Sequence, residues 1–196
     1  MKNKILLIYP QFHMVDFDAK SYPLGLLVIG TLLEKQGYQI KLIDFLVEDS
    51  SWGMLKKELD GNVLCTGLSV MTPQIPQALE ISRLIRNFDK NIPIVWGGVH
   101  STLFPGQTIN NPSIDFLIKG EGEISFAKLL KFFESEDNLE NIPALVYKKN
   151  NQIFQNQNKE LIELNDLPVL DYSLLSPKVL KFESIILNTS RGCPYR

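Results

Sequence analysis

Short apolar segments alternate with longer amphipathic segments from residue 4 to residue 134. The apolar segments predict buried strands at 4–9, 39–45, 63–69, 92–96 and 114–119. The segments between them carry apolar residues at three- and four-residue spacing, which predicts helices at 25–36, 51–59, 75–88 and 123–134. This alternation predicts a doubly wound α/β fold, in which helices cover both faces of a five-stranded parallel sheet.

The pattern changes after residue 134. Residues 144–148 and 152–155 flank a polar turn and predict a small two-stranded β-ribbon. Residues 161–177 contain two prolines and three acidic residues without a sustained period, which indicates a linker that wraps the domain. Residues 184–188 predict a new strand, whereas 105–110 is too short to predict a helix. We therefore expect an α/β domain at 1–138, the ribbon and linker at 139–182, and the first strand of a truncated domain at 183–196.

Composition narrows the classes of partner. The 20 basic and 22 acidic residues are scattered and give a net charge of -2, so no basic face is available for nucleic acid. The longest apolar run, 24–33, is about half of the roughly 20 residues that cross a bilayer. We therefore expect a cytoplasmic protein that binds small molecules, without a nucleic acid or membrane partner. The oligomeric state stays open.

The two cysteines lie in very different settings, which argues against a disulfide framework. Cys65 lies inside an apolar strand and is expected in the core. Cys193 lies near the end of the chain.

The loops that follow the strands are the places to look for a ligand, because open α/β sheets bind ligands outside the carboxyl ends of their strands. Glycines occur at three of these strand ends, at Gly67, at Gly97 and Gly98, and at Gly120 and Gly122. They leave room for a large flat ligand to approach the backbone. Small hydroxyls for the polar edge of such a ligand are offered by Ser69, Thr72, Ser101 and Thr102.

Two other doubly wound classes are disfavoured at the same loops. A nicotinamide-binding domain needs a G-x-G-x-x-G turn directly after the first strand, and the residues there are Tyr-Pro-Gln-Phe at 9–12. A phosphoacceptor receiver domain needs carboxylates at the ends of the first and third strands, where this chain has Tyr9 and Ser69.

The GLSVMTP segment at 67–73 and the Gly97-Gly98 pair resemble two signatures of the cobalamin-binding domain shared with methionine synthase and the B12 mutases. The resemblance implies a flavodoxin-like cobalamin-binding fold. It also implies that the nucleotide tail of the cofactor threads between sheet and helices, past Ser69 and the glycine pair. The cobalt-ligating His of those relatives aligns with Tyr22, and a phenol oxygen is a poor replacement for imidazole. We therefore expect no lower axial bond through this position, and a Tyr22 ring that packs against the corrin.

Three further motifs resemble cobalamin-dependent radical S-adenosylmethionine enzymes, a family that includes anaerobic magnesium-protoporphyrin monomethyl ester cyclases and B12-dependent methyltransferases. They are Pro23-Leu24-Gly25, the Gly-Gly-x-His that ends at His100, and Gly-Glu-Gly-Glu at 120–123. The segment NTSRGCPYR at 188–196 resembles the approach to a C-x-x-x-C-x-x-C motif, with Cys193 as its first cysteine. The resemblance implies a 4Fe-4S cluster and S-adenosylmethionine in the full-length parent, which would methylate or cyclise an unactivated carbon. One thiolate cannot hold a cluster, so we expect this chain alone to be inactive.

The resemblance implies one set of cobalamin-binding residues: Pro23, Leu24, Gly25, Ser69, Met71, Thr72, Gly97, Gly98, His100, Gly120, Glu121, Gly122 and Glu123. Some of these residues have a second explanation. His100 could contact the cofactor or bond a loop carbonyl, and Glu123 could bind corrin amides or stabilise the start of a helix. His13 could reach the corrin from the first loop. Two other functions stay open, a non-catalytic cobalamin sensor or carrier and a degenerate domain that no longer binds cobalamin.

Overall fold

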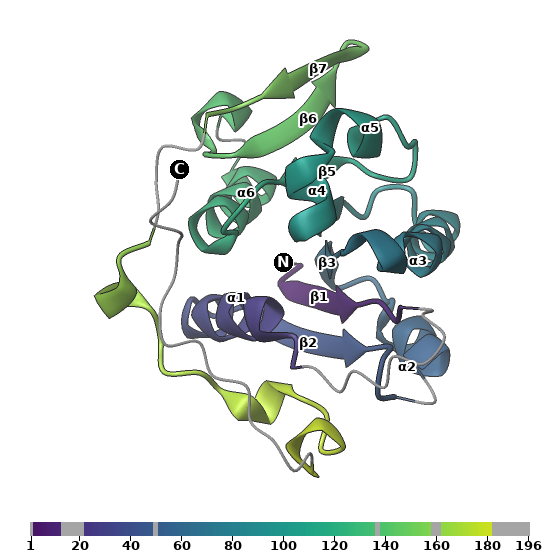
Figure 1. Ribbon diagram of the computed structural model, residues 1–196, viewed down its shortest axis with the longest axis vertical. Helices are drawn as coiled ribbons and strands as arrows, with labels where there is room; N and C mark the ends of the chain where they lie inside the picture. Colours follow the sequence, from purple (N-terminus) through teal and green to yellow (C-terminus); the bar gives the residue numbers. More distant parts are fainter. Residues whose placement is uncertain (1, 13–21, 49–50, 136–137, 158–161, 182–196) are drawn as a thin grey trace.

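The computed structural model describes residues 2–12, 22–48, 51–135, 138–157 and 162–181. These residues form a seven-stranded sheet with the order β2-β1-β3-β4-β5-β6-β7 (Figure 1). Its five parallel strands confirm the predicted fold class. They are β1 (Lys4–Tyr9), β2 (Gln39–Asp44), β3 (Val63–Ser69), β4 (Ile94–Gly97) and β5 (Phe116–Ile118).

The predicted ribbon is part of the main sheet. Its strands are β6 (Leu145–Lys149) and β7 (Gln152–Gln155), and β6 pairs antiparallel with β5. Asn150 and Asn151 at the turn have φ values of 53° and 60°, the left-handed conformation that a tight hairpin turn requires. The predicted two-stranded ribbon is confirmed, and the structure adds that it extends the parallel sheet by two antiparallel strands. Pairing with β6 gives hydrogen-bond partners to the backbone groups along the outer side of β5, and it buries the apolar residues at 145–147.

Helices cover both faces of the sheet, as Figure 1 shows. One face carries α1 (Leu24–Lys35) and α6 (Glu123–Ser135), and the other carries α2 (Ser51–Glu58) and α3 (Ile75–Phe88). Successive side chains of a strand point to opposite faces, so Leu7 packs on the α1 side whereas Leu6 and Ile8 pack on the α3 side. The core is therefore divided by the sheet into two apolar layers.

Two short helices follow β4 and were not predicted from the sequence. They are α4 (Val99–Leu103) and α5 (Pro105–Ile109), and Phe104 lies between them. A five-residue helix is too short to show a helical period, which is why the pattern missed both. The Ile109 side chain is fully buried in the α3-side layer and anchors this segment to the domain.

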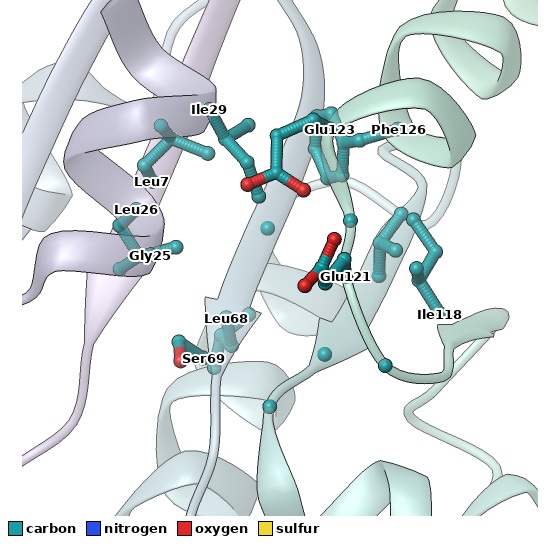
Figure 2. Close-up of a pocket in the computed structure, with 16 residues that line it drawn as sticks. Leu7, Gly25, Leu26, Ile29, Leu68, Ser69, Ile118, Glu121, Glu123 and Phe126 are labelled. Carbon is teal, nitrogen blue, oxygen red and sulfur yellow. The ribbon is translucent and has the colours of Figure 1, made fainter. Parts of the chain in front are cut away.

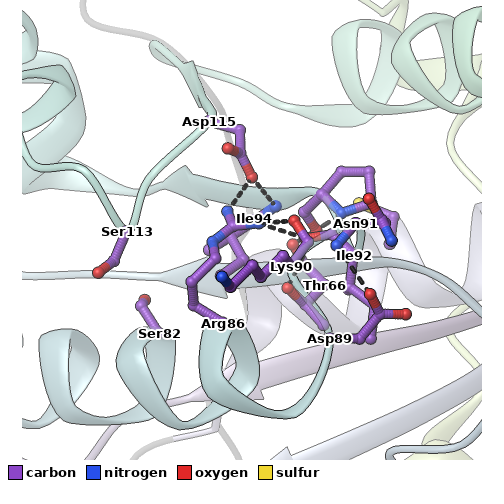
Figure 3. Close-up of polar contacts among 12 residues, drawn as sticks. Thr66, Ser82, Arg86, Asp89, Lys90, Asn91, Ile92, Ile94, Ser113 and Asp115 are labelled. Carbon is purple, nitrogen blue, oxygen red and sulfur yellow. Dashed lines mark hydrogen bonds and ion pairs between the residues drawn. The ribbon is translucent and has the colours of Figure 1, made fainter.

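At the amino-terminal ends of the parallel strands, Arg86 of α3 forms an ion pair with Asp115, the residue before β5 (Figure 3). The Asp115 carboxylate also accepts a hydrogen bond of 2.8 Å from the backbone N–H of Ile94 at the start of β4. These contacts tie α3 to the beginnings of β4 and β5. They lie at the opposite ends of these strands from the loops that carry the sequence motifs.

Residues 162–181, here called the strap, run along the outside of α1 and β2 (Figure 1). The strap contains three short turns of helix, η3 (Leu164–Asp166), η4 (Tyr172–Leu174) and η5 (Val179–Lys181). The predicted strand at 184–188 lies outside the described residues, and the division of the chain into three parts stays a prediction. Among the described residues, no helix combines the length and apolar character needed to cross a membrane.

Candidate functional site

A pocket of about 330 Å³ opens between α1 and α6 at the carboxyl ends of β3, β4 and β5 (Figure 2). Its volume falls in the range of small-molecule sites, and its position is where open α/β sheets bind ligands. The lining residues are Leu7, Gly25, Leu26, Ile29, Gly67, Leu68, Ser69, Val95, Gly97, Gly98, Ile118, Gly120, Glu121, Gly122, Glu123 and Phe126.

Bare backbone forms much of the pocket wall, and at three of its glycines a side chain would not fit without a shift of its neighbours. A Cβ on Gly67 would lie 2.8 Å from the Phe126 ring, and one on Gly122 would lie 3.1 Å from Ile29. Gly98 has a φ of 87°, and a Cβ there would lie 2.8 Å from the backbone N of Val70. The pocket therefore presents flat peptide surface against which a planar ligand can pack, so these residues fit a group such as a nucleotide base.

Hydrogen bonds brace the loops around the pocket. The Val70 N–H donates to the Gly97 carbonyl over 2.9 Å, and the His100 N–H donates to the Val70 carbonyl over 3.0 Å. The Thr102 hydroxyl donates to the Gly98 carbonyl over 2.9 Å and accepts from the Gly120 N–H over 2.8 Å. The hydroxyl of Thr102, expected at the ligand, is therefore used to join the two glycine loops.

Two carboxylates stand beside this glycine wall. Figure 2 shows the side chains of Glu121 and Glu123 turned toward the space between α1 and α6. Glu123, at the start of α6, is buried, and Glu121 is half-buried. The oxygens of a carboxyl group accept hydrogen bonds. The pair can therefore receive hydroxyl or amide donors of a ligand that is otherwise held by apolar and backbone contacts.

The structure brings together most of the residues predicted for the site. Residues from four separate sequence motifs line the pocket: Gly25, Ser69, Gly97, Gly98, Gly120, Glu121, Gly122 and Glu123. The remaining described candidates lie outside its lining: Pro23, Leu24, Met71, Thr72 and His100. Cys193 and His13 lie outside the described residues.

His100 illustrates why some candidates lie elsewhere. Its ring is buried, its Nδ1 lies 3.2 Å from the Thr72 hydroxyl, and it packs against Phe104 at 5.4 Å between ring centroids. Burial lowers the pKa of His100 below its usual value. These contacts tie the loop after β3 to α4.

The apolar part of the lining was not predicted from the sequence. Leu26 and Ile29 of α1, Phe126 of α6, and Leu7 and Val95 of the sheet line the pocket. The helical period of α1 and α6 marked these positions as core, and periodicity alone cannot separate a packed face from one that lines a cavity. Cys65 is buried in the α1-side layer, as expected from its apolar strand. Tyr22, expected against the corrin, is buried in the same layer, and its contact with a corrin stays a prediction.

No cluster of three or more metal-ligating acids, histidines or cysteines occurs within the part of the chain that the structure describes.

The sequence of the chain matches the model of the B12 binding domain family over residues 12–130. This match covers more than half of the 196 residues, and the chain belongs to that family. Membership of this family identifies the class of ligand, which the pocket geometry alone leaves open. B12 is a large planar macrocycle with an attached nucleotide tail.

Similar curated proteins are named as methyltransferases and cyclases. The chain is 29% identical to an uncharacterized methyltransferase of Pyrococcus horikoshii, over 98% of this chain and 44% of that protein. It is 27% identical to an anaerobic magnesium-protoporphyrin IX monomethyl ester cyclase of Synechocystis, over 88% of this chain and 36% of the cyclase. The chain therefore spans less than half the length of these relatives.

Solved structures share the fold. The radical S-adenosylmethionine methyltransferase TsrM of Kitasatospora setae, with cobalamin and a 4Fe-4S cluster bound, aligns with a TM-score of 0.69 at 19% identity, over 86% of this chain and 31% of TsrM. The cobalamin-dependent S-adenosylmethionine radical enzyme OxsB with aqua-cobalamin bound aligns with a TM-score of 0.70 at 23% identity, over 81% of this chain and 23% of OxsB. This likeness confirms the predicted fold.

Proposed function

We propose that this chain binds cobalamin and is the cobalamin-binding part of a radical S-adenosylmethionine enzyme. One observation carries the proposal: a glycine-walled pocket at the carboxyl ends of β3, β4 and β5, in a chain that belongs to the B12 binding domain family. In this proposal the nucleotide tail of the cofactor enters the pocket and the corrin lies outside it, over the strand ends.

Each part of the lining has a separate role in this proposal. Gly67, Gly97 and Gly98 would let the flat base of the tail approach the backbone, and Leu26 and Ile29 would cover its other side. Ser69 and the carboxylates of Glu121 and Glu123 would hydrogen-bond the polar groups of the cofactor. Bound cobalamin supplies a cobalt that can carry a methyl group or assist a radical step, and the protein orients it.

We also propose that the parent protein methylates or cyclises its substrate, since the similar curated proteins are named for these two reactions. A 4Fe-4S cluster that cleaves S-adenosylmethionine needs three thiolates. The chain has two cysteines, and Cys65 is fully buried in the core. The chain by itself should therefore have no radical activity. A cytoplasmic location and the absence of a nucleic acid partner remain part of this proposal, on the grounds of composition.

Retention of the cofactor by the purified chain tests the proposal. The protein is mixed with hydroxocobalamin, desalted, and examined by visible absorption, with a titration to obtain the Kd. We expect about one cobalamin per chain after desalting. Cobinamide, which has the corrin but no nucleotide tail, is the matched control, and its binding should be at least tenfold weaker because it leaves the pocket empty.

Two outcomes would contradict parts of this proposal. A protein that folds but retains no cobalamin would be a degenerate domain. Equal affinity for cobalamin and cobinamide would mean that the pocket does not hold the nucleotide tail.

A further inference from the structure

The strap contacts the helix that forms one wall of the pocket. Its η4 turn packs against both α1 and β2. Leu175 and Val179 of the strap are buried in the α1-side layer of the core. The strap is therefore seated in the domain, with apolar side chains inserted, and it is more than a loose connection.

Two contacts fix the strap to α1. The backbone N–H of Asp171 donates a hydrogen bond of 3.0 Å to the Thr31 hydroxyl, which in turn donates to the Leu27 carbonyl over 2.8 Å. The Leu174 side chain fills the space beside Gly30, since a Cβ at Gly30 would lie 3.2 Å from the Leu174 Cδ1. The missing side chain at Gly30 thus lets the strap approach the helix closely.

A second anchor lies after β2. The Ser176 hydroxyl donates a hydrogen bond to the Glu48 carboxylate, and the Lys178 ammonium lies 3.9 Å from the same carboxylate. The two anchors hold the two ends of the segment 171–178, so the turn between them is pressed against α1 and β2.

A different part of the α1 surface forms the pocket wall. Gly25, Leu26 and Ile29 line the pocket, and Ile29 approaches Gly122 in the loop across the opening. Leu7 of β1 joins the two sides, because it lines the pocket and its Cδ1 lies 3.2 Å from the Cβ position of Gly30. A shift of α1 away from the sheet would change both the pocket wall and the contact between Leu174 and Gly30.

We propose that cobalamin binding and strap seating are coupled through α1, so that an occupied pocket holds the strap in place and a seated strap strengthens cofactor binding. The proposal rests on the proposed function. We propose a positive sign because Leu26 and Ile29 in the pocket wall and Thr31 at the strap belong to the same helix, so a contact that fixes α1 on one side should favour the contact on the other. Through this coupling, the loading of the cofactor would be transmitted to the chain that follows the strap.

Two point variants of the full chain remove contacts between the strap and α1, one by a change in the strap and one by a change in α1. Leu174→Ala removes the side chain beside Gly30, and Thr31→Val removes the acceptor of the Asp171 N–H. Val169→Ala is the matched control, because Val169 is 89% exposed in the same strap. Hydrogen exchange is followed at the amides of Asp171, Leu175 and Val179, whose N–H groups are hydrogen-bonded in the seated strap.

Coupling between two sites is reciprocal, which gives two independent readouts of one factor. Saturating hydroxocobalamin should slow exchange of these three amides in the wild type by about fivefold or more, and each strap variant should weaken the hydroxocobalamin Kd by a similar factor. Val169→Ala should change neither value.

Each contrary result has a distinct meaning. A variant that speeds exchange of the strap amides but keeps the wild-type Kd would show that α1 does not transmit the change. Exchange that neither variant alters would show that these contacts do not seat the strap. Both results would overturn the coupling and leave the proposed function intact, whereas a wild type that binds no hydroxocobalamin would overturn both.

Discussion

The Thr102 hydroxyl accepts a hydrogen bond of 2.8 Å from the backbone N–H of Gly120 and so joins the loop after β4 to the loop after β5. The same hydroxyl donates to the Gly98 carbonyl over 2.9 Å. Three glycines of these two loops line the pocket: Gly98, Gly120 and Gly122. One side chain that does not line the pocket therefore sets the spacing of two of its walls.

Replacing this hydroxyl should loosen the site more than the fold. We expect Thr102→Val to weaken cobalamin binding by about fivefold, equivalent to about 1 kcal/mol, because both loops lose their shared partner. The free energy of unfolding should fall by less than about 1 kcal/mol, since the residue is exposed. Cofactor titration and urea unfolding measure the two effects.

Two controls define the Thr102 experiment. Thr102→Ser keeps the hydroxyl and should restore the affinity. Arg86→Ala breaks the ion pair with Asp115, which lies at the amino-terminal ends of the strands, away from the pocket. This variant should therefore lower stability and leave the Kd unchanged. Unchanged affinity in Thr102→Val would show that the bridge does not hold the pocket loops.

Gly97 and Gly98 should respond differently to substitution although both line the pocket. A Cβ on Gly97 would meet nothing closer than 3.8 Å, and the residue faces the pocket side with Val95, two positions earlier in β4. Gly97→Val should therefore keep stability within about 1 kcal/mol of the wild type. The added side chain would occupy the space of the ligand and weaken cobalamin binding more than tenfold.

Gly98→Ala is the matched comparison. The φ of 87° and the 2.8 Å approach to the Val70 backbone make any side chain strained, so unfolding should become easier by about 2 kcal/mol. Thermal or urea unfolding of the two variants, with the cofactor absent, separates these effects. Wild-type affinity in Gly97→Val would remove this strand end from the binding site.

Asp44 at the end of β2 should make stability depend on pH. Burial raises the pKa of Asp44 to about 6, with a further contribution from the nearby Glu48, against the lowering effect of hydrogen bonds from the backbone N–H groups of Leu46 and Val47. Because the folded pKa lies above the unfolded value of 3.8, the folded state binds the proton more tightly. Stability is thus highest below the unfolded pKa and falls as the pH rises through about 6.

Asp44→Asn tests this reasoning, since the amide oxygen can still accept the 2.9 Å hydrogen bond from the Leu46 N–H. At pH 7.5 the variant should be more stable by about 1 to 3 kcal/mol, at about 1.4 kcal/mol for each unit of pKa shift. Urea unfolding between pH 4 and pH 8 should show the slope in the wild type and its loss in the variant. Asp166→Asn, at an exposed carboxylate of η3, controls for the loss of one charge. A parallel slope in Asp44→Asn would contradict the assignment.

The lower face of bound cobalt should lack a protein nitrogen. Tyr22, which the sequence resemblance places at the position of the ligating His of the B12 mutases, is buried in the α1-side layer. The His100 ring contacts Thr72 and Phe104. Electron paramagnetic resonance of the cob(II)alamin form should therefore show no axial nitrogen splitting from the protein. Splitting that disappears in His13→Ala or His100→Ala would show the opposite.

The sequence by itself determined the three-layer arrangement, in which helices cover both faces of the sheet. Alternation of buried segments such as 4–9 with amphipathic segments such as 75–88 permits one class of fold, because every strand must be covered on both faces. The glycines at 97, 98, 120 and 122 also indicated where the site lies, since glycine at a strand end signals close approach to the backbone.

The tertiary structure decided which side chains share the pocket and which serve the scaffold. Ser69 and Thr72 are three residues apart, but Ser69 lines the pocket and Thr72 contacts His100 outside it. The sequence places such residues in one loop, and the direction of each side chain depends on long-range packing. The contact of Leu174 with Gly30 joins residues far apart in the chain. The pairing of β6 with β5 likewise depends on a partner strand that no local pattern specifies. Local periodicity reports burial, whereas the partner in each contact is fixed by the folded chain as a whole.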